Sequence, residues 1–155
     1  MIDLTCPITH IAPLIPHSGE MILLDRILDF SEDHLIAEAE IRPDHILLKN
    51  NQLTALAGAE IMAQGIAAWG GCKAILANRP IGLGFWLGSR KLTLHRDYIA
   101  IGTLLKIQIK MSIEDSTGFG VFDCQLIDQS NDEVIIEGIL NVLSPPQPER
   151  ETQND

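Results

Sequence analysis

Glu60 and Gln64 are the two side chains between Leu53 and Cys72 that are best suited to chemistry. Glu60 is the one charged residue of this stretch, where nearly all other residues are apolar or small. A carboxyl group in an apolar site is costly unless it is paired, hydrogen-bonded or protonated, and such a group is a candidate general acid or base. Gln64 follows four residues later and therefore shares a helix face with Glu60. The alternative is that Glu60 is tied to Gln64 or to the backbone and does no chemistry.

His45 is the histidine that is best placed to act with Glu60, because it lies in the loop that leads into the same helix. A histidine near a carboxyl group can form an acid–base pair. The alternative is a solvated loop histidine. For the remaining histidines we expect surface or structural roles: His10, His17, His34 and His95.

Other reaction classes find little support in the sequence. The glycines at 82, 84 and 88 lack the spacing of a phosphate-binding loop, and a strand is expected to follow them where a helix should stand. No serine lies in a nucleophile-elbow pattern. The three cysteines are widely spaced, so we expect reduced thiols and no metal or cofactor. Arg90 and Lys91 form a basic pair that could contact a phosphopantetheine or an acidic carrier, or that could only solvate a strand end.

The apolar stretch at 53–72 predicts one long central helix, with Thr54 as its N-cap and with the rest of the chain around all its sides. Antiparallel strands joined by short turns are expected on both sides of it in the sequence. This order predicts an α+β fold in a single domain at 1–143, with an irregular arm at 1–20 and a disordered polar tail at 144–155. The expected strands span residues 21–30, 34–41, 81–95, 103–113, 118–127 and 133–143.

The overall charge restricts the partners. The chain has 155 residues and a net charge of −10, which argues against binding to nucleic acid or to an anionic membrane. The first ten residues have no basic region followed by an apolar run, so we expect no signal peptide, and the helix with Glu60 and several glycines is a poor membrane span. The expected location is the cytoplasm.

Three segments in this order resemble the hot-dog-fold hydroxyacyl-acyl carrier protein dehydratases: LIPHSGEMILLDRILDF at 14–30, GAEIMAQGIAAWGGCKA at 58–74 and GFWLGSRKLTL at 84–94. The similarity is greatest to the dehydratase-like branch of aryl polyene biosynthesis. The resemblance implies a long helix wrapped by a curved antiparallel sheet. It also implies assembly as a homodimer or as a hetero-oligomer with another hot-dog subunit.

The resemblance also implies roles for single residues. Glu60 matches the catalytic carboxylate, which acts as the acid, and the family's histidine base is expected fourteen residues earlier. Position 46 is an isoleucine here, and His45 is adjacent to it. Substrate contacts are implied for Gln64, Gly88 and Gly58, and contacts with the carrier are implied for Arg90 and Lys91.

The implied reaction is dehydration of (3R)-hydroxyacyl thioesters on acyl carrier protein to trans-2-enoyl thioesters, in fatty-acid or polyene biosynthesis. Two alternatives stay open. The chain could be a non-catalytic hot-dog subunit that partners an active dehydratase, or it could be an acyl thioesterase.

Overall fold

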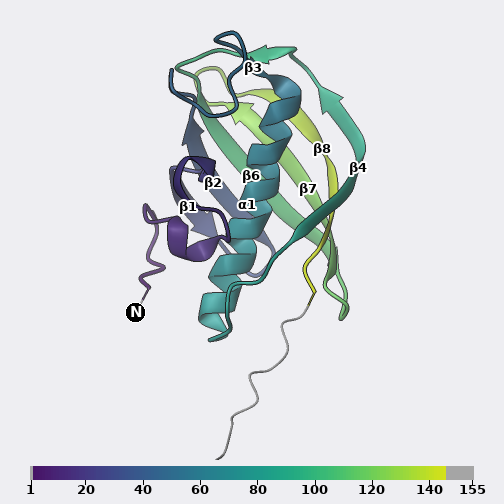
Figure 1. Cartoon of the computed structure of the whole chain (residues 1–155). Coiled ribbons are helices and arrows are strands. Elements are labelled where there is room, and N and C mark those ends of the chain that lie inside the picture. Colours follow the sequence, from purple (N-terminus) through teal and green to yellow (C-terminus); the bar gives the residue numbers. More distant parts are fainter. Residues whose placement is uncertain (1, 146–155) are drawn as a thin grey trace, which may run out of the picture.

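The computed structural model describes residues 2–145, which fold into one long helix against a curved antiparallel sheet (Figure 1). The six strands of the main sheet are ordered β1-β2-β6-β7-β8-β4, and β3 and β5 form a separate pair. The strands are β1 (Arg26–Phe30), β2 (His34–Glu40), β3 (Leu53–Thr54), β4 (Phe85–Leu94), β5 (Tyr98–Ile99), β6 (Leu104–Glu114), β7 (Phe119–Asp128) and β8 (Glu133–Leu143). The predicted α+β hot-dog fold is therefore confirmed.

Helix α1 (Ala55–Leu76) begins where its sequence predicts. The Thr54 hydroxyl accepts a hydrogen bond from the Ala57 N–H at 3.2 Å, so Thr54 is the N-cap. The helix continues one turn past the predicted end at residue 72, and it ends before Asn78, which has a positive φ of 55°. Pro80 then keeps the chain from continuing as a helix.

Strand β8 has the predicted bounds, and the other strands differ from prediction at their ends. The first strand begins at Arg26 and not at residue 21, because Gly19–Met21 form a 3-10 turn (η2). Residues 96–102, which lie between two of the predicted strands, contain β5, which pairs with β3. The predicted tail has only Ser144 and Pro145 in the described structure, and residues 146–155 lie outside it.

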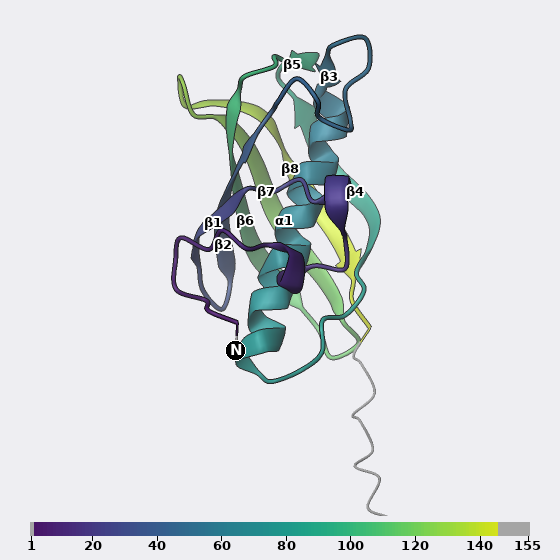
Figure 2. The same cartoon turned by 60° about the vertical axis from the view of Figure 1, so that its left-hand side comes forward.

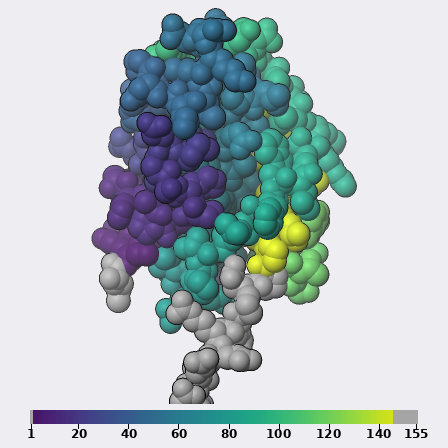
Figure 3. Space-filling view, in the orientation of Figure 1, coloured from purple at the N-terminus to yellow at the C-terminus, as the bar shows by residue number. Residues whose placement is uncertain are grey.

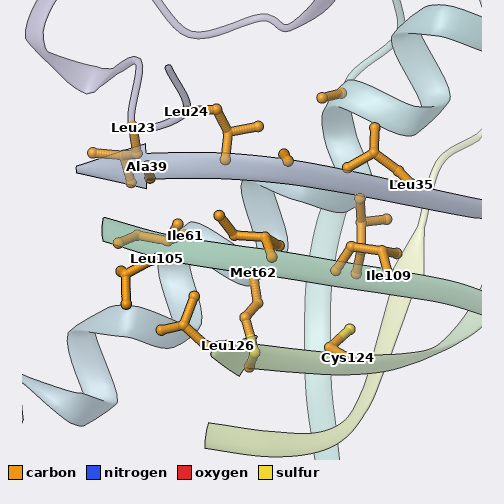
Figure 4. Close-up of a cluster of buried hydrophobic side chains, with 14 of the residues drawn as sticks. Leu23, Leu24, Leu35, Ala39, Ile61, Met62, Leu105, Ile109, Cys124 and Leu126 are labelled. Carbon is orange, nitrogen blue, oxygen red and sulfur yellow. The ribbon is translucent and has the colours of Figure 1, made fainter. Parts of the chain in front are cut away.

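The side of α1 that faces the sheet forms the core, where apolar side chains from the helix meet those of β2, β6 and β7 (Figure 4). Two helix glycines permit this close contact. A Cβ atom at Gly58 would lie 2.8 Å from a Leu126 methyl carbon, and one at Gly65 would lie 3.0 Å from an Ile107 methyl carbon. Glycine costs about 1 kcal/mol in a helix relative to alanine, and the tight packing of helix on sheet offsets that cost.

The N-terminal arm crosses a second side of α1 (Figure 2). Its 3-10 turn η1 (Ala12–Leu14) contacts the helix, and Leu14 is fully buried. A third side of α1 stays exposed, with 59% of Leu56 and 68% of Leu76 accessible to solvent. The expectation of a helix covered on all sides is therefore wrong for the single chain, because sheet and arm together cover only part of the helix.

In residues 2–145, no helix combines the length and the hydropathy that a membrane crossing requires.

Candidate active site

A groove of about 950 Å³ runs along the uncovered side of α1. Figure 3 shows this side of the molecule, with the N-terminal arm in purple. The helix contributes small residues three or four apart, which leave room above the backbone: Ala63, Ala67, Gly70 and Ala74. Large side chains complete the walls, among them Trp69, Trp86 and Phe122. A long, mainly apolar cleft of this volume has the character of a ligand site.

The walls of the groove are held rigidly. The Trp69 and Phe122 rings meet edge to face, with centroids 5.3 Å apart and an interplanar angle of 72°. The Trp69 indole N–H donates to the Ser31 carbonyl at 3.1 Å. The Trp86 indole N–H donates to the Gly88 carbonyl at 2.8 Å, at a register shift between β4 and β8. A glycine inside a strand often marks such an irregularity.

Glu60 lines this groove, but its side chain is exposed and not buried as the sequence suggested. The sheet covers the opposite face of α1, so the carboxyl group is turned toward the open side. The alternative in which Gln64 binds Glu60 does not apply, because the Gln64 amide is engaged elsewhere.

Gln64 is buried and fastens the arm to the helix. Its side-chain oxygen accepts hydrogen bonds from the Leu23 N–H at 2.6 Å and the Leu24 N–H at 3.2 Å. Its side-chain nitrogen donates to the Met21 carbonyl at 2.7 Å. The side chain also borders the groove, so the substrate contact implied by the resemblance stays a prediction, while the structure assigns the amide to the arm.

His45 is half-buried in the loop before β3 and is not among the residues that line the groove. Its Nδ1 accepts a hydrogen bond from the Leu47 N–H at 3.2 Å. Burial lowers the pKa of His45 below its usual value of 6.5, and the Arg42 guanidinium lowers it further, while Asp25 and Asp44 partly oppose the shift. Within one chain, the structure therefore does not bring His45 to the groove of Glu60.

We expect His45 to make the fold less stable in mild acid. Because its pKa is lower in the folded state, the unfolded chain binds more protons, and the contribution to stability is lost as the pH falls below about 6.5. Chemical denaturation of wild type and His45→Gln at several pH values between about 5 and 7.5 tests this, and the variant should show the flatter dependence. Parallel curves for the two proteins would contradict it.

The other predicted site residues are not among those that line the groove. Gly58 is buried on the sheet-facing side of α1, and Gly88 lies on β4, where an added Cβ would have no atom within 4 Å. Arg90 and Lys91 are exposed on β4. The basic residues that line the groove itself are Lys73, with its ammonium 4.4 Å from the Trp69 ring centroid, and Arg79.

His17 lines the same groove as Glu60, which sequence reasoning did not predict. Its Nδ1 is buried and has no hydrogen-bond partner within residues 2–145. The side chain comes from the irregular arm, whose path over the helix depends on tertiary contacts. The one available signal was its place in the Leu-Ile-Pro-His segment, at the start of the first motif of the resemblance.

A family model described as "ApeP-like: ApeP dehydratase" matches residues 9–153. The chain belongs to the ApeP-like dehydratase family. Membership in this family supports a dehydratase role and confirms the resemblance to the aryl polyene branch of the hot-dog dehydratases. No curated protein matches the chain.

One solved structure supports the assignment to the ApeP-like dehydratases, and two others share the fold. A chain of the dehydratase heterocomplex ApeI:P from Xenorhabdus doucetiae is 25% identical, with a TM-score of 0.80 over 88% of this chain and 91% of that one. The PaaI protein of the E. coli phenylacetic acid degradation operon is 9% identical, with a TM-score of 0.58 and coverage of 76% and 80%. A hypothetical thioesterase with coenzyme A from Streptococcus pneumoniae is 13% identical, with a TM-score of 0.58 and coverage of 78% and 88%. The last two show likeness of fold alone.

Proposed function

We propose that this chain dehydrates (3R)-hydroxyacyl thioesters on acyl carrier protein to trans-2-enoyl thioesters. The observation that carries the proposal is the exposed carboxyl group of Glu60 in the lining of a long, mainly apolar groove, in a member of a dehydratase family. The small residues at 63, 67, 70 and 74 leave space for an extended acyl chain along the helix. The groove volume of about 950 Å³ lies in the range of small-molecule sites.

The reaction requires two proton-transfer groups. A base removes a proton from C2 of the substrate, the C2–C3 double bond forms, and the C3–O bond breaks as an acid protonates the leaving hydroxyl group, which departs as water. Glu60 is proposed as the acid and a histidine as the base, in the roles that the family resemblance implies. Backbone N–H groups directed at the thioester oxygen would stabilise the enolate-like charge.

The carrier is proposed to contact Arg90 and Lys91. The chain has a net charge of −10, so an acidic carrier protein is repelled by most of its surface. These two exposed cations on β4 offer a local exception. Their contact would steer the carrier toward the edge of the sheet beside the groove wall at Trp86.

The test is incubation of the purified protein with a (3R)-hydroxyacyl carrier protein, followed by mass spectrometry of the acyl group. Loss of about 18 mass units, the mass of the water molecule that acid–base elimination releases, with the thioester intact supports the proposal. Release of free hydroxy acid would indicate a thioesterase instead.

A second candidate function is a non-catalytic subunit that completes the site of a partner dehydratase. It is favoured by the absence of His45 from the groove lining and by the heterocomplex in which the Xenorhabdus chain was solved. If turnover requires a second hot-dog subunit and survives Glu60→Gln in this chain, the second function replaces the first.

We predict an oligomer in which the free edge of β4 lies at the interface between subunits. Within residues 2–145 this strand pairs only with β8 and ends the sheet, and an unpaired edge favours association. Apolar side chains on and just before β4 are exposed to solvent: Leu83 at 57%, Phe85 at 52% and Leu87 at 57%. Light scattering at micromolar concentration should give a mass above that of the 17.1 kDa monomer, alone or with a second hot-dog subunit.

The matched variants are Phe85→Glu on β4 and Leu104→Glu at the start of β6, where 39% of the side chain is exposed. Only the change on β4 is expected to lower the oligomer mass. A wild-type protein that stays monomeric with and without a hot-dog partner would contradict the prediction.

A further inference from the structure

We propose that His17, and not His45, is the imidazole that acts with Glu60 in the groove. The inference rests on the proposed dehydration and names its second proton-transfer residue. Both side chains line one continuous groove in the same chain, whereas His45 does not. The sequence expectation for His17 was a surface or structural role.

Two anchors fix the part of the arm that carries His17. On one side, the Leu14 carbonyl oxygen lies so close to Gly71 that a Cβ atom there would be 1.8 Å away. On the other side, Gln64 holds the Met21 carbonyl at 2.7 Å and the Leu23 N–H at 2.6 Å. His17 is three residues after the first anchor and four residues before the second. The segment that carries His17 therefore crosses α1 between Gln64 and Gly71, beside the helix turns that follow Glu60.

The hydrogen bonding of the His17 ring is consistent with contact to a ligand. Its Nδ1 is buried without a partner in the described chain, and a buried polar atom without a hydrogen bond costs about 1 to 3 kcal/mol. The ring is therefore not committed to another part of the described chain through Nδ1, and the residue lines the groove. His45 differs in this respect, because its Nδ1 already accepts the Leu47 N–H at 3.2 Å.

In the proposed step, neutral His17 takes the proton from C2, and the electron pair of that C–H bond forms the C2–C3 double bond. The C3–O bond breaks, its electron pair stays on oxygen, and the protonated Glu60 carboxyl group donates the proton that completes the water molecule. His17 ends protonated and Glu60 ends ionised. Transfer of one proton from His17 to Glu60 through the released water molecule restores both groups, so no oxidant or other reactant is needed.

The experiment compares single-turnover dehydration of a hydroxyacyl carrier substrate by wild type, His17→Ala, His17→Asn, His45→Ala and Glu60→Gln. His10→Ala is the control, since His10 is an exposed histidine of the same arm. We expect both His17 variants to lose about a hundredfold or more in rate. Thermal unfolding of each variant checks that the fold survives. His17→Asn keeps a polar side chain at this position but cannot take up a proton, so a role in packing alone would largely survive in it, whereas a proton-transfer role would not.

The outcomes separate the two proposals. If His17→Ala or His17→Asn keeps a rate within about threefold of wild type while Glu60→Gln is inactive, the proposed function stands and the role of His17 is overturned. The same conclusion follows if His45→Ala loses the activity and the His17 variants keep it. If the wild type does not dehydrate the substrate with or without a second hot-dog subunit, the proposed function fails, and the role of His17 fails with it.

Discussion

Glu60→Gln is expected to lower the rate of dehydration by about a thousandfold or more. Glutamine has nearly the same shape and volume as glutamate, so the groove and its apolar lining stay as they are. The amide cannot donate a proton to the leaving hydroxyl group as a carboxylic acid does. The loss should appear in the rate of the chemical step with little change in substrate binding, because the donated proton stabilises only the transition state.

The fold should not change with this substitution. Glu60 is exposed on the open side of α1, and a substitution at such a position is usually within about 0.5 kcal/mol of neutral. Glu32→Gln, at an exposed position of the turn between β1 and β2, is the matched control. Retention of more than about a tenth of the wild-type rate by Glu60→Gln would remove the carboxyl group from the mechanism.

Gly71→Ala is expected to destabilise the protein by about 2 to 4 kcal/mol. An added Cβ would lie 1.8 Å from the Leu14 carbonyl oxygen and 2.7 Å from its carbonyl carbon. Both atoms belong to the backbone, so no side-chain rotation relieves the overlap, and the arm must leave the helix. Leu14 is fully buried, and its displacement exposes apolar surface and moves His17 with it.

Gly70→Ala is the matched control for stability, because a Cβ at Gly70 would have no atom within 4 Å. In a helix interior, alanine is favoured over glycine by about 1 kcal/mol, so this neighbour should be neutral or slightly stabilised. Chemical denaturation at one protein concentration measures both variants. Equal effects at the two positions would contradict the account of the arm, since helix propensity alone predicts the same sign for both.

Local patterns in the sequence determined most of the secondary structure. The long apolar stretch with a threonine before it predicted α1 and its N-cap, because the Thr54 side chain satisfies an N–H group within the same turn. Alternation with a period of two predicted β2 and β6, because neighbouring side chains of a strand point to opposite faces. The candidate carboxyl group was also visible, as a lone charge among apolar residues.

The face of α1 on which each of these residues lies could not be predicted from the sequence. Helical spacing relates Glu60, Gln64 and Gly58 to one another, but it does not say which side meets the sheet. The structure turns Gly58 to the sheet, Gln64 to the arm and Glu60 to the open groove. The expectation of a buried carboxyl group was wrong for this reason.

The pairing of β4 with β8 and the path of the arm were decided by tertiary structure alone. The arm at 1–20 has little regular structure, so no period in its sequence predicts where its side chains point. Its position follows from two contacts between residues far apart in the chain, Leu14 with Gly71 and Met21 with Gln64. The sequence by itself therefore determined the elements and one proton-transfer candidate, whereas only long-range packing brought His17 to the groove of Glu60.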